Sequence, residues 1–434
     1  MLNTKDTIAA IATPPGEGAI GILRLSGPES LLIAERVFQG RKIIPMESRE
    51  SNRLYVGHIQ DPDSGETLDE VMLAVFRQPQ TYTGEDLVEI QAHGGTFILR
   101  RILELLLRQG ARLAEPGEYT RRAFLNGRMD LTQAEAVADL IKAQSSLAEK
   151  AALSQLGGGL SHALKSYTSD LLDILAELEA HIDFPEEELP DHLYESDLEK
   201  VTSIKEKIKT LLTSARYGKA IREGVRTVLI GKPNAGKSSL LNRLLDEERA
   251  IVTPLPGTTR DTITEQVVVD GIPFVLTDTA GIRHTSDVVE KEGVRRSREA
   301  ISQADLIVLI LDQSRPWDEE DQTLLNLIKE LAPQTPVLAA LNKSDLPNQL
   351  SCQEIPSCPV VELSALTGNG LTHLRQAMAN RVREGQVTDS TSTLMVTNLR
   401  HAELLEKTVA DLDRVWDGLA HQVSPELISP DLRE

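Results

Sequence analysis

The chain has 434 residues, with 46 basic and 66 acidic side chains and a formal net charge of −20 at pH 7. This length predicts about three domains and is enough to bury substantial cores. The acidic balance excludes general binding of polyanions, so any RNA must bind at a local basic patch or with the help of a partner. Aromatic residues make up only 3% of the chain, which excludes a broad base-stacking surface.

The cysteine content and the apolar runs exclude further classes of protein. Cys352 and Cys358 are too few for a disulfide scaffold or a cysteine-rich zinc module, and we expect reduced thiols in a cytoplasmic protein. No apolar run approaches the ~20 residues that span a membrane. The first ten residues show no basic stretch followed by an apolar core, so we expect no export signal.

Residues 1–120 are predicted to mix strands and helices. A helix is expected from Thr96, as its N-cap, to Gln109, where Gly110 ends it. Short apolar runs bounded by glycine and proline predict strands at residues 8–12, 19–25, 71–76 and 87–90.

Residues 121–217 show helical periodicity and few turn signals. Thr132 and Glu135 form a T-x-x-E pattern that predicts a capping box, and Gly157–Gly159 predicts a break. Long helices are expected at residues 160–181 and 196–217, and the chain is helical again from about residue 393. We therefore expect one all-α domain that is interrupted by the segment between these parts.

Residues 218–385 alternate apolar runs with helical segments. Four runs consist almost wholly of aliphatic residues, as buried parallel strands do: residues 228–230, 306–311, 337–341 and 360–361. A hairpin is expected for residues 267–269 and 274–276 across Asp270-Gly271. The predicted fold class is a multidomain protein with an N-terminal α+β domain, a split all-α domain and an inserted P-loop α/β domain.

The strongest functional pattern is GKPNAGKS at Gly231–Ser238, which lies between a predicted strand and a predicted helix. It matches G-x-x-x-x-G-K-[ST], whose glycines let backbone N–H groups surround phosphates at a helix N-terminus. Lys237 would reach the β- and γ-phosphates, and the Ser238 hydroxyl would bind Mg²⁺. This motif predicts a nucleoside triphosphate site.

Two further segments complete the expected phosphate site. Asp278–Gly281 (DTAG) ends the second strand of the hairpin, where the carboxylate would hold the Mg²⁺ water shell and Gly281 would meet the γ-phosphate. Gly257–Asp261 (GTTRD) lies between the P-loop and Asp278, and a threonine hydroxyl there would complete the Mg²⁺ shell.

The predicted base specificity is for guanine. Asn342–Asp345 (NKSD) ends another buried strand, and the Asp345 carboxylate can accept hydrogen bonds from guanine N1–H and N2–H₂, a pair that adenine lacks. Ser364-Ala365 follows the next strand and suits a backbone contact with guanine O6. Together with the P-loop, these motifs predict a GTPase rather than an ATPase.

The residue directly after DTAG is Ile282. Ras-like enzymes have a glutamine there to orient the attacking water, and isoleucine can neither donate nor accept a hydrogen bond. The groups that assist hydrolysis must therefore come from elsewhere.

The P-loop with Asn234, the segment Gly257–Asp261 and the segment 278–283 resemble the TrmE-Era-EngA group of GTPases. Other segments narrow the resemblance to the MnmE (TrmE) family of tRNA-modification GTPases, over nearly the whole chain. These are residues 12–16, 21–24, 82–86, 93–95, 116–127 and 183–185.

The resemblance implies an N-terminal folate-binding and dimerisation domain, a helical domain in two parts and an inserted G domain. The implied limits are 1–120, 121–217, 218–385 and 386–434, the last without the tail by which members of the family end. The resemblance further implies a homodimer whose hydrolysis is activated by K⁺ and by pairing of two G domains. A monovalent cation beside the phosphates would stabilise developing charge as an arginine finger does.

The resemblance also assigns site residues. Glu290 and Lys237 are the implied catalytic residues, and only the resemblance distinguishes Glu290 from an ordinary solvated charge. Ser238 and Thr259 are implied for Mg²⁺, and Asn234, Thr253, Leu255 and Thr258 for K⁺. The GTP contacts are implied to be Asn234, Ala235, Gly236, Lys237, Ser238, Ser239, Thr253, Pro254, Leu255, Pro256, Gly257, Thr258, Asp278, Thr279, Ala280, Gly281, Asn342, Lys343, Asp345, Ser364 and Ala365.

Arg24, Glu89 and Arg128 match the family's contacts with 5-formyltetrahydrofolate or another tetrahydrofolate derivative. A guanidinium suits the folate glutamate tail, and a carboxylate suits the pterin N–H edge. The implied partner is the FAD-dependent protein MnmG, in a heterotetramer. Together the two proteins add an aminomethyl or carboxymethylaminomethyl group to C5 of the wobble uridine of certain tRNAs.

One departure from the family concerns the end of the sequence. Members end in a cysteine and a short tail, whereas this sequence ends at residues 431–434, DLRE. We expect this difference to leave GTP hydrolysis intact. It puts the tRNA modification chemistry in question.

Two other classes fit parts of the sequence. A ribosome-assembly GTPase of the Era or EngA kind would carry its RNA-binding domain after the G domain, whereas the large extra domains here precede it. A dynamin-like mechanical GTPase would suit the long helices, but the sequence has no membrane-binding signature.

Overall fold

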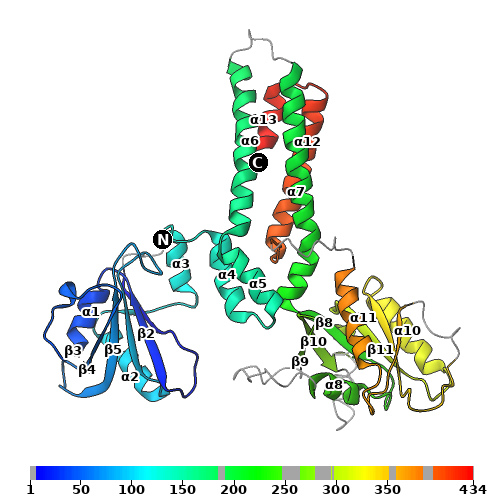
Figure 1. The fold of residues 1–434 in the computed structure, drawn as a ribbon, viewed down its shortest axis with the longest axis horizontal. Helices are drawn as coiled ribbons and strands as arrows, with labels where there is room; N and C mark the ends of the chain where they lie inside the picture. The colour runs from blue at the N-terminus through cyan, green and yellow to red at the C-terminus, as the bar shows by residue number, and fades with distance from the viewer. Residues whose placement is uncertain are drawn as a thin grey trace. The chain divides into compact units, whose positions relative to one another are not determined.

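The structure is a computed structural model that describes residues 6–183, 191–246, 264–278, 295, 298–350, 358–384 and 394–433 (Figure 1). For residues 191–193, 264 and 278 it describes the backbone alone. Several predicted site residues lie outside the described residues: Thr253–Thr259, Thr279–Gly281, Ile282 and Glu290. The chain divides into two compact units, Met1–Ala138 and Asp139–Glu434.

The first unit is built on a sheet whose strand order is β3-β4-β5-β6-β2-β1-β7 in the described residues. Its neighbours pair antiparallel except β1 and β7, which pair parallel. The strands are β1 (Ile8–Ile11), β2 (Ile20–Ser26), β3 (Phe38–Gly40), β4 (Arg53–Gln60), β5 (Thr67–Phe76), β6 (Leu87–His93) and β7 (Arg112–Leu113). The helical elements are α1 (Ser30–Val37), the 3₁₀ helix η1 (Met46–Ser48), α2 (Thr96–Arg108), α3 (Glu118–Leu125) and α4 (Leu131–Lys142), which extends past the unit's limit.

The core of this unit lies between the sheet and helices α1 and α2. The apolar side of α2 places Leu99, Ile102, Leu105 and Leu106 against buried strand residues such as Ile90. The predicted strands at 8–12, 19–25, 71–76 and 87–90 and the helix from 96 are confirmed, whereas β3 and β4 were not predicted. The N-cap of α2 is Gly95 rather than Thr96, and it makes no side-chain cap bond.

The helical part of the second unit joins segments from both sides of the α/β insertion. Its helices are α5 (Ser146–Leu156), α6 (Gly159–Asp183), α7 (Asp191–Glu223), α12 (Leu399–Ala420) and α13 (Pro425–Arg433). Helix α12 packs on α7, and α13 packs on α6 and α12 (Figure 1). The buried residues of these helices, such as Ile174, Ile208 and Leu412, form one core. The predicted split all-α domain is therefore confirmed.

Two local predictions about helix ends have different outcomes. The break at Gly157–Gly159 is confirmed, because α5 ends at Leu156 and α6 begins at Gly159. The capping box at the start of α4 consists of Asp130 and Gln133 rather than Thr132 and Glu135. The Gln133 amide donates to Asp130 Oδ1, and the Asp130 amide donates to Gln133 Oε1, both at 3.0 Å. Both pairs fit the same spacing, and the helix begins two positions earlier than predicted.

The α/β part has the strand order β13-β12-β11-β8-β10-β9 in the described residues. All neighbours pair parallel except β9 and β10, the predicted hairpin. The strands are β8 (Val225–Ile230), β9 (Thr264–Val269), β10 (Ile272–Asp278), β11 (Leu306–Asp312), β12 (Val337–Asn342) and β13 (Val360–Glu362). The helices are α8 (Lys237–Asp246), α10 (Glu319–Leu331) and α11 (Leu371–Arg383).

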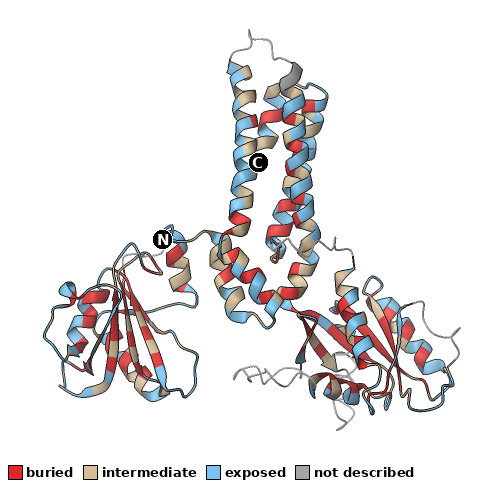
Figure 2. Ribbon diagram, in the orientation of Figure 1, coloured by how far each residue is buried: buried red, intermediate tan, exposed pale blue. Residues whose placement is uncertain are grey.

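Burial in this part follows the predicted pattern except at residues 360–361. Val360 is exposed and Val361 is half-buried, because β13 is an edge strand of the sheet. The run from Leu306 to Leu311 is buried at every position, and buried strand segments are red in Figure 2. Its alternate residues pack into two cores, one with α8 and α11 and the other with α10, so helices cover both faces of the sheet. Helix α7 contributes to two cores: Ile204 and Ile208 pack among the long helices, whereas Tyr217 and Ala220 pack against the α/β core. Among the described helices, none is long and apolar enough to cross a membrane.

Candidate active site

The predicted nucleotide motifs gather at the carboxyl ends of the parallel strands. The P-loop follows β8, whose Leu229 pairs with Asp278 at the end of β10. Asn342 at the end of β12 pairs with Asp312 at the end of β11. In open α/β sheets, ligands bind in the crevice outside this edge. The topology therefore brings the expected phosphate and base motifs to one place.

The P-loop wraps around the side chain of Lys237. Lys237 is buried, and its Nζ donates to the carbonyl oxygens of Gly231 and Lys232, each at 2.8 Å. Asn234 and Gly236 adopt left-handed backbone conformations, with φ of +63° and +99°. These turns carry the loop into the N-terminus of α8, where the helix dipole favours an anion.

Asn342 connects the P-loop to the segment after β13. Its Nδ2 donates to the Ala235 carbonyl at 2.7 Å, and its Oδ1 accepts from the Ala365 amide at 2.9 Å. The side chain is buried, so both hydrogen bonds are shielded from water. A Cβ on Gly236 would lie 2.1 Å from Asn342 Nδ2, which explains why glycine occupies that position.

The residues predicted to recognise the base are held by neighbouring side chains and amides. The hydroxyl of the buried Ser364 donates to Asp345 Oδ1 at 2.5 Å and accepts from the Thr367 amide at 3.2 Å. One oxygen of the exposed Asp345 is thereby oriented. Lys343 has a left-handed φ of +68°, and its Nζ lies 2.5 Å from Asp312 Oδ2.

Asp312 is a residue of this site that the sequence analysis missed. Burial alone would raise its pKa, but hydrogen bonds from the Lys343 ammonium and from the Ser314 hydroxyl and amide outweigh burial and lower it. Asp312 therefore remains ionised and fixes Lys343. Its place at the end of a buried strand, level with Asn342, is the one signal that could have revealed it.

A second missed contact holds the P-loop to α10. Lys232 Nζ lies 2.7 Å from Asp318 Oδ2 and 2.7 Å from Asp321 Oδ2. Asp318 is the N-cap of α10, and it forms a capping box with Asp321. The D-x-x-D pattern at residues 318–321 predicts a helix start but gives no indication of its partner 86 residues earlier.

The residues present at this edge suit the metals that the sequence implies. Asn234 and Ser238 are exposed and provide an amide oxygen and a hydroxyl, the hard oxygen donors that Mg²⁺ and K⁺ prefer. The remaining implied metal ligands lie outside the described residues. Ser239 is exposed beside Ser238 at the start of α8, and Ala235 is buried.

A separate candidate site lies on the sheet of the first unit, where Arg24 on β2 faces Glu89 on β6. Arg24 Nε and one terminal nitrogen lie 2.9 and 2.6 Å from Glu89 Oε1. The guanidinium carbon lies 5.4 Å from the Tyr82 ring centre and 5.6 Å from that of Tyr119. These two tyrosines were not predicted as site residues, and their places in motifs shared with the family were the available signal.

Arg128 contacts the backbone of the residue directly before Tyr82. Its Nε donates to the Thr81 carbonyl at 2.9 Å, and its side chain is exposed. The site thus has two guanidinium groups, one carboxylate and two aromatic rings. Such a set can bind a planar heterocycle that carries a negatively charged tail.

Comparison with known proteins covers both units. The family model for the GTP-binding protein TrmE N-terminus matches residues 7–128, and that for the MnmE helical domain matches residues 131–434. The tRNA modification GTPase MnmE of Levilactobacillus brevis is 48% identical over 432 residues, which cover 98% of this chain and 92% of that protein. The Bacillus subtilis tRNA modification GTPase MnmE is 44% identical over 432 residues, covering 98% and 93%.

A solved structure is also similar over part of the chain. The crystal structure of Aquifex aeolicus Era bound to GDP.AlF4- is 26% identical and covers 43% of this chain and 65% of that one, with a TM-score of 0.29. The family models and the full-length relatives decide the classification: the chain belongs to the MnmE family of tRNA modification GTPases and is a GTP hydrolase.

Proposed function

We propose that this GTPase works with the FAD-dependent protein MnmG to modify C5 of the wobble uridine of certain tRNAs. The added group is aminomethyl or carboxymethylaminomethyl, and a tetrahydrofolate derivative donates the carbon. The chain acts in the cytoplasm as a homodimer within a heterotetramer, and K⁺ and pairing of two G domains activate its hydrolysis. The domain limits are 1–120, 121–217, 218–385 and 386–434.

The single observation that carries the cation proposal is the position of Asn234. It is exposed on the P-loop with a φ of +63°, next to the expected phosphates. Ile282 supplies no polar side chain after DTAG, so hydrolysis needs another source of charge stabilisation. A K⁺ ion held by Asn234 with Thr253, Leu255 and Thr258 would supply positive charge beside the phosphates.

Within this proposal the other site residues have separate tasks. Lys237 binds the β- and γ-phosphates, Ser238 and Thr259 hold Mg²⁺, and Glu290 positions the attacking water. Asp345 reads guanine, and Ser364 holds its carboxylate in the accepting orientation, as their 2.5 Å contact supports. The other assigned contacts line the nucleotide: residues 234–236, 239, 253–258, 278–281, 342–343 and 365.

The folate proposal is supported by Arg24, Glu89 and Arg128. Glu89 and Arg24 form an ion pair with a contact of 2.6 Å. A folate whose pterin edge donates to Glu89 would therefore compete with Arg24 for that carboxylate. The released guanidinium could then bind the glutamate tail. Arg128 is exposed and adds a second positive charge.

GTP turnover in KCl and NaCl, measured across a range of protein concentrations, tests the cation and the pairing together. We expect faster turnover in K⁺ and a rate per molecule that rises with concentration. Asn234→Ala should remove the difference between the salts. Asn326→Ala, an exposed asparagine on α10 of the same part, is the matched control and should keep it.

Equal rates in the two salts would reject the potassium mechanism. A rate per molecule that does not depend on concentration would reject activation by pairing, whichever salt is used. Guanine binding would survive both results, because it depends on Asp345 and the P-loop.

A further inference from the structure

A cavity of about 290 Å³ lies at the amino-terminal edge of the α/β sheet. It is enclosed by the end of α7, the first residues of β8 and β11, the loop before β12 and the end of α11. The P-loop and Asp345 lie beyond the carboxyl ends of the same strands. The cavity is therefore on the opposite edge of the sheet from the nucleotide site, and no motif in the sequence points to it.

The lining carries three cations, two of which have no ion pair with the described residues. Arg216 and Lys219 on α7 and Arg381 on α11 line the cavity together with one acid, Asp305. Arg226 neutralises Asp305 through two contacts of 3.0 Å from its guanidinium. Within the described part of the chain, neither Arg216 nor Lys219 has an ion pair or a side-chain hydrogen bond.

Arg381 is only partly satisfied. One of its terminal nitrogens pairs with Glu384, while its Nε is buried and has no hydrogen-bond partner among the described residues. A buried donor without an acceptor costs free energy. Three cations around one cavity are unusual in a chain with a net charge of −20, where carboxylates are plentiful.

The rest of the lining is apolar. Ala220, Val225, Leu306, Pro336 and Val382 contribute to the same cavity. Its volume is just below the usual range of small-molecule sites, roughly 300–1,000 Å³. A ligand that fits both features has a small flat or apolar body and a phosphate, which is the chemistry of one nucleotide unit.

We propose that this cavity binds one nucleotide unit of the tRNA on which the proposed function acts. The phosphate lies toward Arg216, Lys219 and Arg381, and the base or sugar lies on the apolar side. Such a contact gives an acidic protein a local point of attachment for a polyanion. A free nucleotide has the same chemistry, and the experiment separates the two sources.

The experiment measures binding of an unmodified tRNA transcript to the full chain over a series of salt concentrations, without MnmG and in NaCl. Arg216→Glu and Lys219→Glu should each lower the affinity about tenfold and reduce the slope of log K against log salt by about one. Lys209→Glu, the same charge change on the same helix outside the cavity, should change the affinity less than twofold.

GTP turnover should stay at the parent rate in all three variants, because the cavity lies on the opposite edge of the sheet from the P-loop. A folding defect could also lower the affinity, so Lys219→Gln is tested as well and the thermal midpoint of unfolding is measured for each variant. The glutamine variant should lose affinity as well, at an unchanged midpoint. Omitting MnmG and K⁺ keeps this result independent of the modification and cation proposals.

A second arm titrates AMP and CMP, which lack the guanine edge that Asp345 reads. If tRNA affinity is unchanged in the variants while AMP binding is lost, the cavity is a nucleotide site but RNA is not its ligand. If Lys209→Glu weakens tRNA binding as much as Lys219→Glu, the attraction is diffuse and the proposal is rejected. Unchanged binding of both ligands in the cavity variants also rejects it.

Discussion

The ammonium of Lys232 lies 2.7 Å from a carboxylate oxygen of Asp321, which is 89 residues later in the sequence. Burial alone would lower the pKa of Lys232, but the hydrogen bonds that its ammonium donates to Asp318 and Asp321 outweigh burial and raise the pKa. The carbonyl of the same lysine accepts from Lys237 Nζ at 2.8 Å. The first turn of α10 thus holds the backbone group that orients Lys237, the lysine proposed to bind the phosphates.

Lys232→Met is predicted to weaken GDP and GTP binding about tenfold, because the acceptor of Lys237 loses its anchor and two carboxylates lose their cation. Lys232→Arg should retain most of the affinity, since a guanidinium can bridge both acids. Dissociation rates of a fluorescent guanine nucleotide provide the measurement. Equal affinity in the methionine and arginine variants would show that the contact does not position the P-loop.

Gly236→Ala is predicted to abolish nucleotide binding. The new Cβ would lie 2.1 Å from Asn342 Nδ2 at a φ of +99°, so the link between the P-loop and Ala365 must break. Gly368→Ala is the matched control. It has a φ of +89°, and its Cβ would meet only Leu371, at 3.9 Å.

The control variant should lose about 1 kcal/mol of stability from its left-handed backbone and still bind nucleotide. Equilibrium binding and thermal unfolding of both variants separate the two effects. Retained binding in Gly236→Ala would contradict the role given to Asn342.

Asp345→Asn is predicted to move base preference from guanine toward xanthine. Xanthine presents a carbonyl where guanine has its amino group, and an amide can donate to that carbonyl as a carboxylate cannot. Ser364 can still donate to the amide oxygen, so the side chain should remain oriented. Competition between GTP and XTP for hydrolysis is the measurement, and unchanged selectivity would count against Asp345 as the residue that reads the base.

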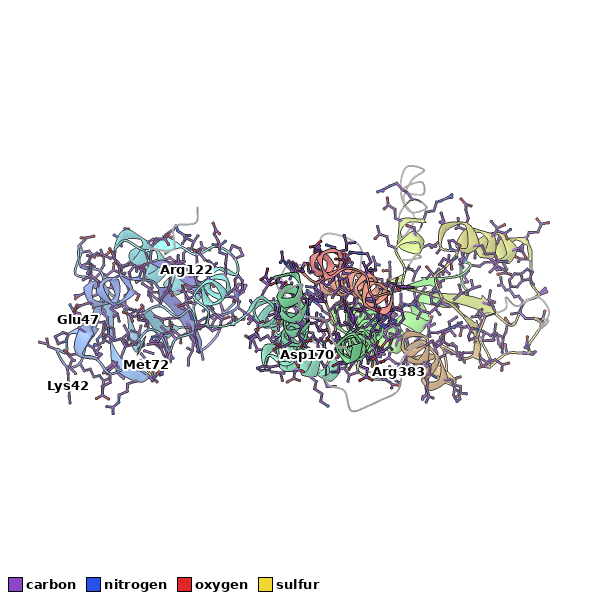
Figure 3. The ribbon with its side chains drawn as sticks, turned by 90° about the horizontal axis from the view of Figure 1, so that it is seen from above. Lys42, Glu47, Met72, Arg122, Asp170 and Arg383 are labelled. Atoms are coloured by element: carbon purple, nitrogen blue, oxygen red, sulfur yellow. The ribbon has the colours of Figure 1, made fainter. Side chains whose placement is uncertain are left out.

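The first unit is predicted to lose stability in acid because of Glu118. Burial alone would raise the pKa of this carboxyl. Hydrogen bonds from Arg112, the Glu115 amide and Arg122 outweigh burial and lower the pKa from 4.5 to about 2. Arg122 is labelled in Figure 3. Since the folded pKa is depressed, the stabilisation is complete above about pH 4.5. It is lost as the pH falls toward 2.

Glu118→Gln should remove this pH dependence and lower the stability of the unit at pH 7 by about 3 kcal/mol, because Arg112 and Arg122 lose a buried partner. Urea unfolding at pH 7, 4.5 and 3 tests it. Glu115→Gln, whose side chain is more exposed, is the control and should change stability little. Parallel pH profiles for Glu118→Gln and the parent chain would contradict the assignment.

The features that could be predicted are those in which a short stretch of chain must contain particular residue types for chemical reasons. The P-loop, Asn342–Asp345 and the buried strands follow from short patterns, and the structure places them as those patterns require. Asp312 and the partners of Lys232 were missed, because ion pairs across 31 and 86 or more residues depend on how the strands and helices come together.

Strand β4 was missed for a related reason. Gly57 interrupts its apolar pattern, and glycine ordinarily weakens a strand. In the structure a Cβ there would lie 2.3 Å from the Gln39 carbonyl on β3, so the neighbouring strand requires glycine. That requirement exists only after the two strands have paired.

Helix α7 runs without interruption from Asp191 to Glu223, and its residues belong to two different cores. At 1.5 Å per residue the helix is about 50 Å long. Its C-terminal part packs on the core of the α/β sheet through Tyr217 and Ala220. A tilt of about 5° at that attachment would swing the far end by about 4 Å. The helix therefore has the form of a lever arm that can amplify a small change beside GTP into a displacement large enough for another protein to sense.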